Sequence, residues 1–166
     1  MNSLGLIIIF VSVSSIGFLK AVQYTKAYKE LYAFILFLKF IKTEICVYYT
    51  RQRDIFERFE NKILEQNGFL TSLRQEEIVD EKSPIYHILK KYDKKLLICD
   101  EAKNHLLEFS SNFGQMSAEE QRVRLDTTIS FLEEIYIKEK EEGTKLKKSY
   151  SSLGIVLAVA IVLILI

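Results

Sequence analysis

Residues 153–166 read LGIVLAVAIVLILI, a stretch that is purely apolar apart from one glycine. With residues 149–152 it would form about 27 Å of helix, which nearly spans the roughly 30 Å hydrocarbon core of a bilayer. A buried helix of a soluble core is the alternative. Such a helix rarely carries so many apolar residues without interruption, so we predict a transmembrane helix over residues 149–166.

A second uncharged stretch covers residues 4–19, which read LGLIIIFVSVSSIGFL and are followed by Lys20. Counted from Met1, this segment gives about 28 Å of helix. A cleaved signal peptide is the alternative, but no Lys or Arg precedes the apolar run and no clear small-x-small cleavage site follows it. We therefore expect a retained transmembrane helix over residues 1–22.

All charged side chains lie between Lys20 and Lys148, where 23 Lys and Arg residues nearly balance 22 Asp and Glu residues. The resulting net charge of +1 argues against a strongly basic nucleic-acid-binding protein. Lysines flank the inner side of both predicted spans, and the outer tails carry no Lys or Arg. The positive-inside rule therefore predicts a two-pass protein of the cell membrane, with residues 23–148 as a cytoplasmic domain and both termini outside.

The central domain has apolar residues at helical spacing and shows no sustained alternation typical of strands. Ser83-Pro84 is a helix-start signal, and Asn67-Gly68 is a turn or helix-end signal. The longest of the predicted helices should form the spine of the core, with Tyr48 on its apolar face. Helices are predicted over residues 31–49, 54–66, 70–79, from Ser83-Pro84 through Tyr92, and over 96–113 with a break near Asp100.

Ser117-Ala118-Glu119-Glu120 is a capping box, in which Ser begins a helix and Glu stands three residues later. The helix that follows is expected to be solvated over its charged segment, 133–148. Residues 118–166 form either one helix of roughly 70 Å or two helices with a hinge at Gly143. The predicted fold is all-α: an antiparallel helical bundle flanked by one transmembrane helix at each end, the last helix being long.

No motif of the sequence points to chemistry. The chain lacks a glycine-rich phosphate-binding loop, and its two histidines, His87 and His105, do not stand at metal-binding spacing. Cys46 and Cys99 have apolar neighbours and are expected to be free thiols that act as small core residues. We therefore predict that the protein is not an enzyme and has no catalytic residue, no cofactor and no metal site.

Two groups of lysines are candidate contacts for a partner or for lipid. Four lysines form a strip around residue 92, and its simplest interpretation is a solvated helix face. A docking strip for an acidic partner or for anionic lipid is the alternative. Three more lysines precede the C-terminal span, where their ammonium groups would reach lipid headgroups. The two groups are Lys90, Lys91, Lys94 and Lys95, and Lys145, Lys147 and Lys148.

Several short motifs resemble those of the stage III sporulation protein AB family of endospore-forming bacteria. In the N-terminal half these are Ile16-Gly17-Phe18-Leu19 and Thr43-Glu44-Ile45 with Thr50 after it. In the C-terminal half, Phe113-Gly114-Gln115 is followed by Gln121, a charged helix, and Ser152-Leu153-Gly154 before the apolar tail. The family-like positions are Gly17, Glu44, Gly114, Gln115, Gln121, Leu153 and Gly154.

This resemblance implies a function that the composition alone does not suggest. Members of the family belong to a secretion-like complex that joins mother cell and forespore around engulfment. They lie in the mother-cell-derived outer forespore membrane. Their helical domain is similar to the cytoplasmic domains of the type II secretion platform protein. The implied partners are a secretion-type cytoplasmic ATPase and other membrane proteins of the complex, and a homo-oligomer is compatible with these features.

Under this interpretation the chain is a non-enzymatic platform or adaptor that couples the ATPase to the membrane assembly. The main alternative is a membrane-anchored helical regulator that binds anionic lipid or another protein. A membrane enzyme with an unrecognised site is a further alternative, for which the sequence offers no converging polar residues.

Overall fold

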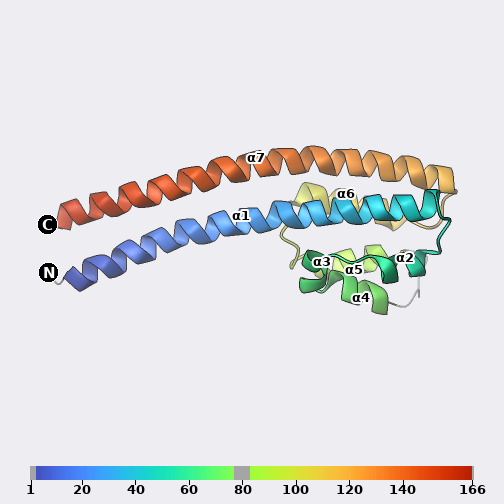
Figure 1. Cartoon of the computed structure of the whole chain (residues 1–166), viewed down its shortest axis with the longest axis horizontal. Helices are drawn as coiled ribbons and strands as arrows, with labels where there is room; N and C mark the ends of the chain where they lie inside the picture. Colours follow the sequence, from blue (N-terminus) through green and yellow to red (C-terminus); the bar gives the residue numbers. More distant parts are fainter. Residues whose placement is uncertain (1–2, 77–82, 166) are drawn as a thin grey trace. The chain divides into compact units, whose positions relative to one another are not determined.

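The computed structural model (Figure 1) describes the backbone of residues 3–76 and 83–165. It describes side chains for residues 22–76, 83–146, 148 and 149. Within these residues the chain forms α-helices and no β-strand, so the predicted all-α class is confirmed. The helices are α1 (Ser3–Cys46), α2 (Gln52–Arg58), α3 (Lys62–Gln66), α4 (Phe69–Gln75), α5 (Pro84–Tyr92), α6 (Asp100–Ser111) and α7 (Ala118–Leu165).

The chain divides into two compact units. The first unit takes in the residues up to Lys26 and those from Lys138 onward, and the second unit is Ala27–Ile137. The side chains of 1–21 and 150–166, on which both predicted spans depend, lie outside the described ones. No helix within the described part of the chain combines the length and the apolarity that crossing a membrane requires. The predicted boundaries at 22/23 and 148/149 stay predictions.

Helix α1 joins two segments that the sequence suggested as separate helices. Residues 20–30, which connect the N-terminal apolar stretch to the predicted helix over 31–49, contain neither glycine nor proline. Nothing therefore interrupts the backbone hydrogen bonds between the two segments. The helix ends at Cys46, three residues earlier than predicted, because Tyr49 takes a positive φ of 53° that no helix accommodates.

The core of the second unit is built around the α1 spine. The ring of Phe37 lies 5.1 Å from that of Phe59 and 6.0 Å from that of Phe69, centroid to centroid. Burying one such side chain contributes about 1.5–3 kcal/mol. Within this unit α1 and α7 run antiparallel, as Figure 1 shows. The side chains buried from these two helices include Leu31, Phe34, Ile35, Leu38, Ile41, Leu125, Ile129 and Leu132.

The prediction of a single helix over residues 54–66 is wrong, because α2 and α3 are separated by a break at residues 59–61. The side-chain oxygen of Asn61 accepts the backbone N–H of Ile63 at 3.0 Å and so starts α3. The guanidinium of Arg74, on α4, donates to the carbonyl oxygen of Phe59 at 2.7 Å. A backbone carbonyl just after α2 and a backbone N–H at the start of α3 thus both have hydrogen-bond partners, at a place where a continuous helix was expected.

Three of the predicted boundary signals are confirmed. The backbone N–H of Tyr86 donates to the hydroxyl oxygen of Ser83, which caps α5. Gly68 has a φ of 84° between α3 and α4, a conformation that suits glycine. Helix α6 begins at Asp100, where a break was expected, so the residues from 96 to 99 form a loop rather than helix.

The capping box at the start of α7 is also confirmed. The N–H of Glu120 donates to the Ser117 hydroxyl oxygen at 3.3 Å, and the N–H of Ser117 donates to the Glu120 carboxylate at 3.0 Å. Helix α7 then continues through Gly143, which is buried in the helix. Of the two alternatives for residues 118–166, the single helix is therefore correct over its described length. Residue 166 lies outside the described residues.

Candidate functional site

Glu44 is a family-like position whose role the structure makes clear. It lies in the last turn of α1 and is 7% exposed. Its carboxylate accepts the Thr50 hydroxyl at 2.5 Å and the Arg58 guanidinium at 3.2 Å, and its backbone carbonyl accepts the Thr50 N–H at 3.0 Å. The sequence Thr43-Glu44-Ile45 with Thr50 is therefore a clasp that closes the turn between α1 and α2.

Three large side chains of the turn that the clasp closes are exposed to solvent. Val47, Tyr48 and Tyr49 are 61%, 65% and 79% exposed. Tyr49 has the only positive φ among the described residues other than glycine, a conformation that is unfavourable for a bulky side chain. The sequence placed Tyr48 on the buried face of a helix. That prediction is wrong because α1 ends before it.

Three further family-like positions lie in the turn between α6 and α7 and in the first turn of α7. Gly114 has a φ of 93°, and a Cβ atom there would lie 3.2 Å from the Oε1 atom of Gln52, at the start of α2. The Gln121 amide donates to the backbone carbonyl of Met116 at 2.8 Å and fixes the same turn, while Gln115 is exposed. These positions and the Glu44 clasp lie at the same end of the second unit, where α1 ends and α7 begins (Figure 1).

A groove of about 500 Å³ runs between α1 and α7 within the second unit, and Cys46, Val47 and Ile129 are among the residues that line it. Two ion pairs join its walls: Lys39 to Glu133 at 2.6 Å, and Lys42 to Asp126. Exposed ion pairs of this kind contribute at most about 1 kcal/mol each. Their descending partner numbers show that the two helices run antiparallel here.

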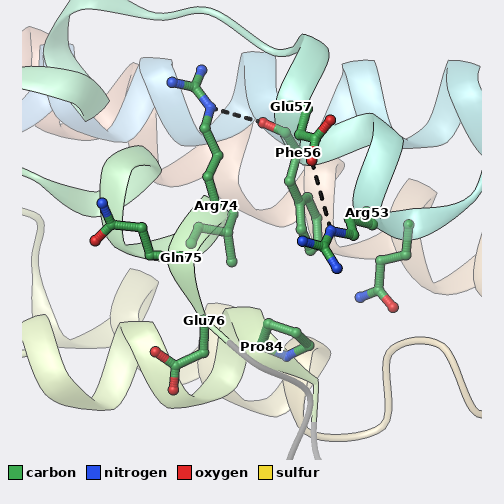
Figure 2. Close-up of a pocket in the computed structure, with 9 residues that line it drawn as sticks. Arg53, Phe56, Glu57, Arg74, Gln75, Glu76 and Pro84 are labelled. Atoms are coloured by element: carbon green, nitrogen blue, oxygen red, sulfur yellow. Dashed lines mark hydrogen bonds and ion pairs between the residues drawn. The ribbon is translucent and has the colours of Figure 1, made fainter.

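A second hollow, of about 490 Å³, lies between α2 and α4 (Figure 2). Figure 2 shows the Arg74 guanidinium directed at the carbonyl oxygen of Phe56, to which it donates at 3.1 Å. It also shows Arg53 paired with Glu57, at 3.6 Å. The two cations that line the hollow, Arg53 and Arg74, are already engaged within the fold. The hollow between these two helices therefore offers little free charge to a ligand.

The strip of lysines is only partly helical. Lys90 and Lys91 lie in the last turn of α5, whereas Lys94 and Lys95 follow the helix in a turn, so the four do not share one helix face as predicted. All four are exposed, and the Lys95 ammonium lies 5.0 Å from the centre of the Tyr92 ring. Their role as partner or lipid contacts stays a prediction.

Some predicted positions can be placed only in part. Lys145 and Lys148 are exposed on α7. The side chain of Lys147 lies outside the described ones, and so do the surroundings of Gly17, Leu153 and Gly154. Their contacts stay predictions.

The described residues contain no group of three His, Cys, Asp or Glu side chains that could hold a metal ion. His105 stacks on Phe131 with ring centres 3.6 Å apart, and Cys46 and Cys99 are free thiols that are partly buried. Cys99 packs against the core as expected.

Comparison with known families gives one match over nearly the whole chain. A family profile described as "Stage III sporulation protein AB" matches residues 2–166. Neither a curated protein nor a solved structure matches the chain at a significant level.

Proposed function

Because the chain belongs to the stage III sporulation protein AB family and so takes part in stage III of sporulation, we propose that it is a two-pass membrane component of a secretion-like complex. In this role it couples a secretion-type cytoplasmic ATPase to the membrane assembly between mother cell and forespore, and it performs no catalysis itself. The family match over residues 2–166 carries the proposal.

The support for membrane anchoring comes from the sequence. The uncharged stretches 4–19 and 153–166 have nearly the length that a bilayer requires, and lysines border each on its inner side. By the positive-inside rule this arrangement favours a cytoplasmic helical domain, and in the proposed role that cytoplasm is the mother cell's, where the ATPase is accessible. The proposed location is the mother-cell-derived outer forespore membrane.

The use of polar groups in the second unit supports an adaptor role. The Glu30 carboxylate, 3% exposed, accepts the Asn67 amide and the Leu97 backbone N–H, both at 2.6 Å. The Glu44 carboxylate accepts Thr50 and Arg58. Both buried acids therefore position loops. Rigid loops presented to solvent suit a protein that binds other proteins.

A membrane-anchored regulator that binds anionic lipid is the second candidate. It is favoured by the four exposed lysines, 90, 91, 94 and 95, none of which forms an ion pair within the described residues. Each such lysine near an anionic membrane surface contributes about 1 kcal/mol of binding. Binding of the purified protein to anionic vesicles, with loss on Lys→Glu changes at these positions, would favour this candidate.

The test of the proposed function is a clean deletion in the source organism, scored by heat-resistant spore count and by microscopy of engulfed forespores. We expect a block after engulfment, with small or collapsing forespores, that the intact gene restores. The tagged protein should then retain the ATPase in detergent pull-downs. A normal spore count would contradict the proposal, and a block without ATPase retention would leave the regulator as the better candidate.

A further inference from the structure

Basic side chains gather where α5 connects to α6, at the end of the second unit that α1 enters. We call this segment the lysine loop and define it by its exposed side chains, which are Lys90, Lys91, Lys94, Lys95 and Leu97. Leu97 is 41% exposed, although its neighbours on both sides are buried. The lysine loop therefore presents one apolar side chain together with four cations.

Hydrogen bonds fix the position of the lysine loop within the unit. The Leu97 backbone N–H donates to the Glu30 carboxylate at 2.6 Å, and Glu30 stands three residues after Ala27, where the unit begins. At the other end of α5 and α6, the Ser83 hydroxyl donates to the Ser110 carbonyl oxygen at 2.6 Å. Figure 1 shows the connection between α5 and α6 at the opposite end of the unit from the connection between α6 and α7. The lysine loop is thus the tip of a helical hairpin that points to the end where α1 enters.

This end of the unit is also the one nearer to the predicted spans along the chain. Helix α1 continues from the predicted span over residues 1–22 to Glu30, eight residues beyond it, which is about 12 Å of helix. Lipid headgroups occupy roughly 6 Å of that length. The remaining distance is shorter than the screening length of about 8 Å in physiological salt. With the span in a bilayer, lysines at the level of Glu30 therefore lie within the attraction of an anionic surface.

The lysine loop is positively charged even when every carboxylate of the segment is counted. Residues 90–103 hold five lysines and three carboxylates, which gives a net charge of +2. Two of the carboxylates, Asp93 and Asp100, share the ammonium group of Lys103, at 3.8 Å and 3.5 Å. The third, Glu101, is exposed in the first turn of α6.

Charged side chains of the neighbouring elements at this end cancel one another. The Glu65 carboxylate on α3 pairs with the Arg74 guanidinium on α4 at 3.3 Å. The other charges here are two cations and two carboxylates: Lys29 and the buried Glu30 on α1, Lys62 on α3 and the exposed Glu134 on α7. The net charge of +2 on the lysine loop is therefore left without compensation.

We propose that the lysine loop rests on the anionic leaflet of the membrane that the chain's own spans cross. This inference rests on the two-pass anchoring in the proposed function, and it holds for the adaptor and for the regulator alike. The four lysines face lipid phosphate groups, and Leu97 enters the boundary between headgroups and acyl chains. The contact holds one end of the second unit against the bilayer. The opposite end, with the turn between α1 and α2, then faces the cytoplasm.

The test uses an indole as a reporter of lipid contact. The sequence contains no tryptophan, so Leu97→Trp gives the full-length protein a single indole. Its fluorescence is measured in nanodiscs of brominated anionic lipid and in nanodiscs of brominated zwitterionic lipid, since bromine quenches an indole on contact. We expect loss of fluorescence in the anionic nanodiscs alone, and recovery at about 1 M salt, where the screening length falls to about 3 Å. Tyr48→Trp, at a residue of the other end that is 65% exposed, is the matched control and should stay fluorescent in both.

Charge changes made together with Leu97→Trp identify the groups that bind the lipid. Lys94→Gln should weaken the contact equilibrium about fivefold, which corresponds to ~1 kcal/mol for one lysine near an anionic surface. Lys94→Glu combined with Lys95→Glu should abolish the quenching. Arg51→Glu combined with Arg124→Glu makes the same change of charge at exposed residues of the other end and should leave the quenching as it was.

Hydrogen exchange of the unchanged protein is a second measurement, which needs no tryptophan. Backbone amides of residues 93–95 should exchange more slowly in anionic than in zwitterionic nanodiscs. Those of residues 47–49, in the exposed turn after α1, should exchange equally in both. Equal exchange of residues 93–95 in the two lipids would contradict the contact.

The outcomes distinguish this inference from the proposed function. If carbonate extracts the unchanged protein from membranes, the two-pass anchoring fails, and this inference fails with it. If the protein stays in the membrane and Leu97→Trp fluoresces equally in the two lipids, only the lipid contact of the lysine loop is wrong. If the two lysine reversals abolish retention of the ATPase and Leu97→Trp is never quenched, the lysine loop binds an acidic partner protein. That result also overturns the inference.

Discussion

Two buried glutamates on α1 each accept hydrogen bonds from a loop, but one of these loops packs side chains into the core and the other exposes them. The Glu30 carboxylate accepts the backbone N–H of Leu97, in the loop before α6. The neighbours of Leu97, Leu96 and Ile98, are buried in the core. The Glu44 carboxylate accepts the Thr50 hydroxyl, in the turn before α2, and the side chains of Val47, Tyr48 and Tyr49 in that turn are exposed to solvent. The comparison shows that a buried carboxylate fixes only the backbone of a loop. The residues next to it decide whether the loop closes a core or presents a surface.

The largest effect is expected from Glu30→Ala. It would leave the backbone N–H of Leu97 and the amide of Asn67 without their acceptor in a partly buried place. Each unsatisfied group of this kind costs about 1–3 kcal/mol, so we expect a loss of about 3 kcal/mol in the free energy of unfolding. Denaturant unfolding followed by circular dichroism measures it. Glu134→Ala, at an exposed residue of α7, is the control, and equal stability of the two variants would contradict the assigned role.

A smaller loss is expected from Glu44→Ala, about 1.5 kcal/mol, because Arg58 is largely exposed and can be rehydrated. Denaturant unfolding of both glutamate variants, followed by circular dichroism, measures the difference. A loss in Glu44→Ala that equals or exceeds the loss in Glu30→Ala would contradict the comparison.

A still smaller effect, of opposite sign, is expected from Tyr49→Gly. Relief of the positive φ is worth about 1–2 kcal/mol, and the greater freedom of glycine in the unfolded chain offsets about 0.5–1 kcal/mol of this. We expect a net gain of about 0.5 kcal/mol. Tyr48→Gly, at the neighbouring residue with ordinary φ, should instead be neutral or destabilising. The same change in unfolding temperature for both variants would show that the strain at Tyr49 has no energetic weight.

The smallest effect concerns the capping box of α7. Hydrogen bonds from the Ser117 hydroxyl and backbone N–H lower the pKa of Glu120. A group whose pKa is lower in the folded state stabilises the fold above its unfolded pKa, and this contribution is lost as the pH falls through the folded value. Glu120→Gln should therefore lower the unfolding temperature at pH 7, and this difference should shrink as the pH falls below about 4. A difference that persists unchanged at low pH would contradict the role of the ionised carboxylate.

Local signals made much of the fold predictable. Ser83 and Ser117 begin helices through bonds to residues three positions away, and such bonds can be read directly from the chain. The break between α2 and α3 could not be read in this way. It depends on Arg74, which reaches back 15 residues to the carbonyl of Phe59. Asn61 was the one local clue, since it is a good helix-starting residue.

The exposed turn of Val47, Tyr48 and Tyr49 was hidden from the sequence for a related reason. Nothing local in the sequence showed that the Glu44 carboxylate is buried against Thr50 and Arg58. The helical spacing of apolar residues extended through Tyr48, so a helix was expected where the chain turns. The motif Thr43-Glu44-Ile45 with Thr50, singled out through resemblance rather than through pattern, contains two residues of the clasp, Glu44 and Thr50.

The bonds of Glu30 also bear on the order in which the chain assembles during synthesis. Its partners are 37 and 67 residues further along. At about 5–20 residues per second, a ribosome delivers Leu97 roughly 3–13 seconds after Glu30. During this interval the apolar face of α1 has no α6 to cover it, and Leu125 and Leu132 arrive later still. The apolar face of α1 therefore stays without α6 while 67 of the 166 residues are synthesised, and a chaperone could bind it during this time.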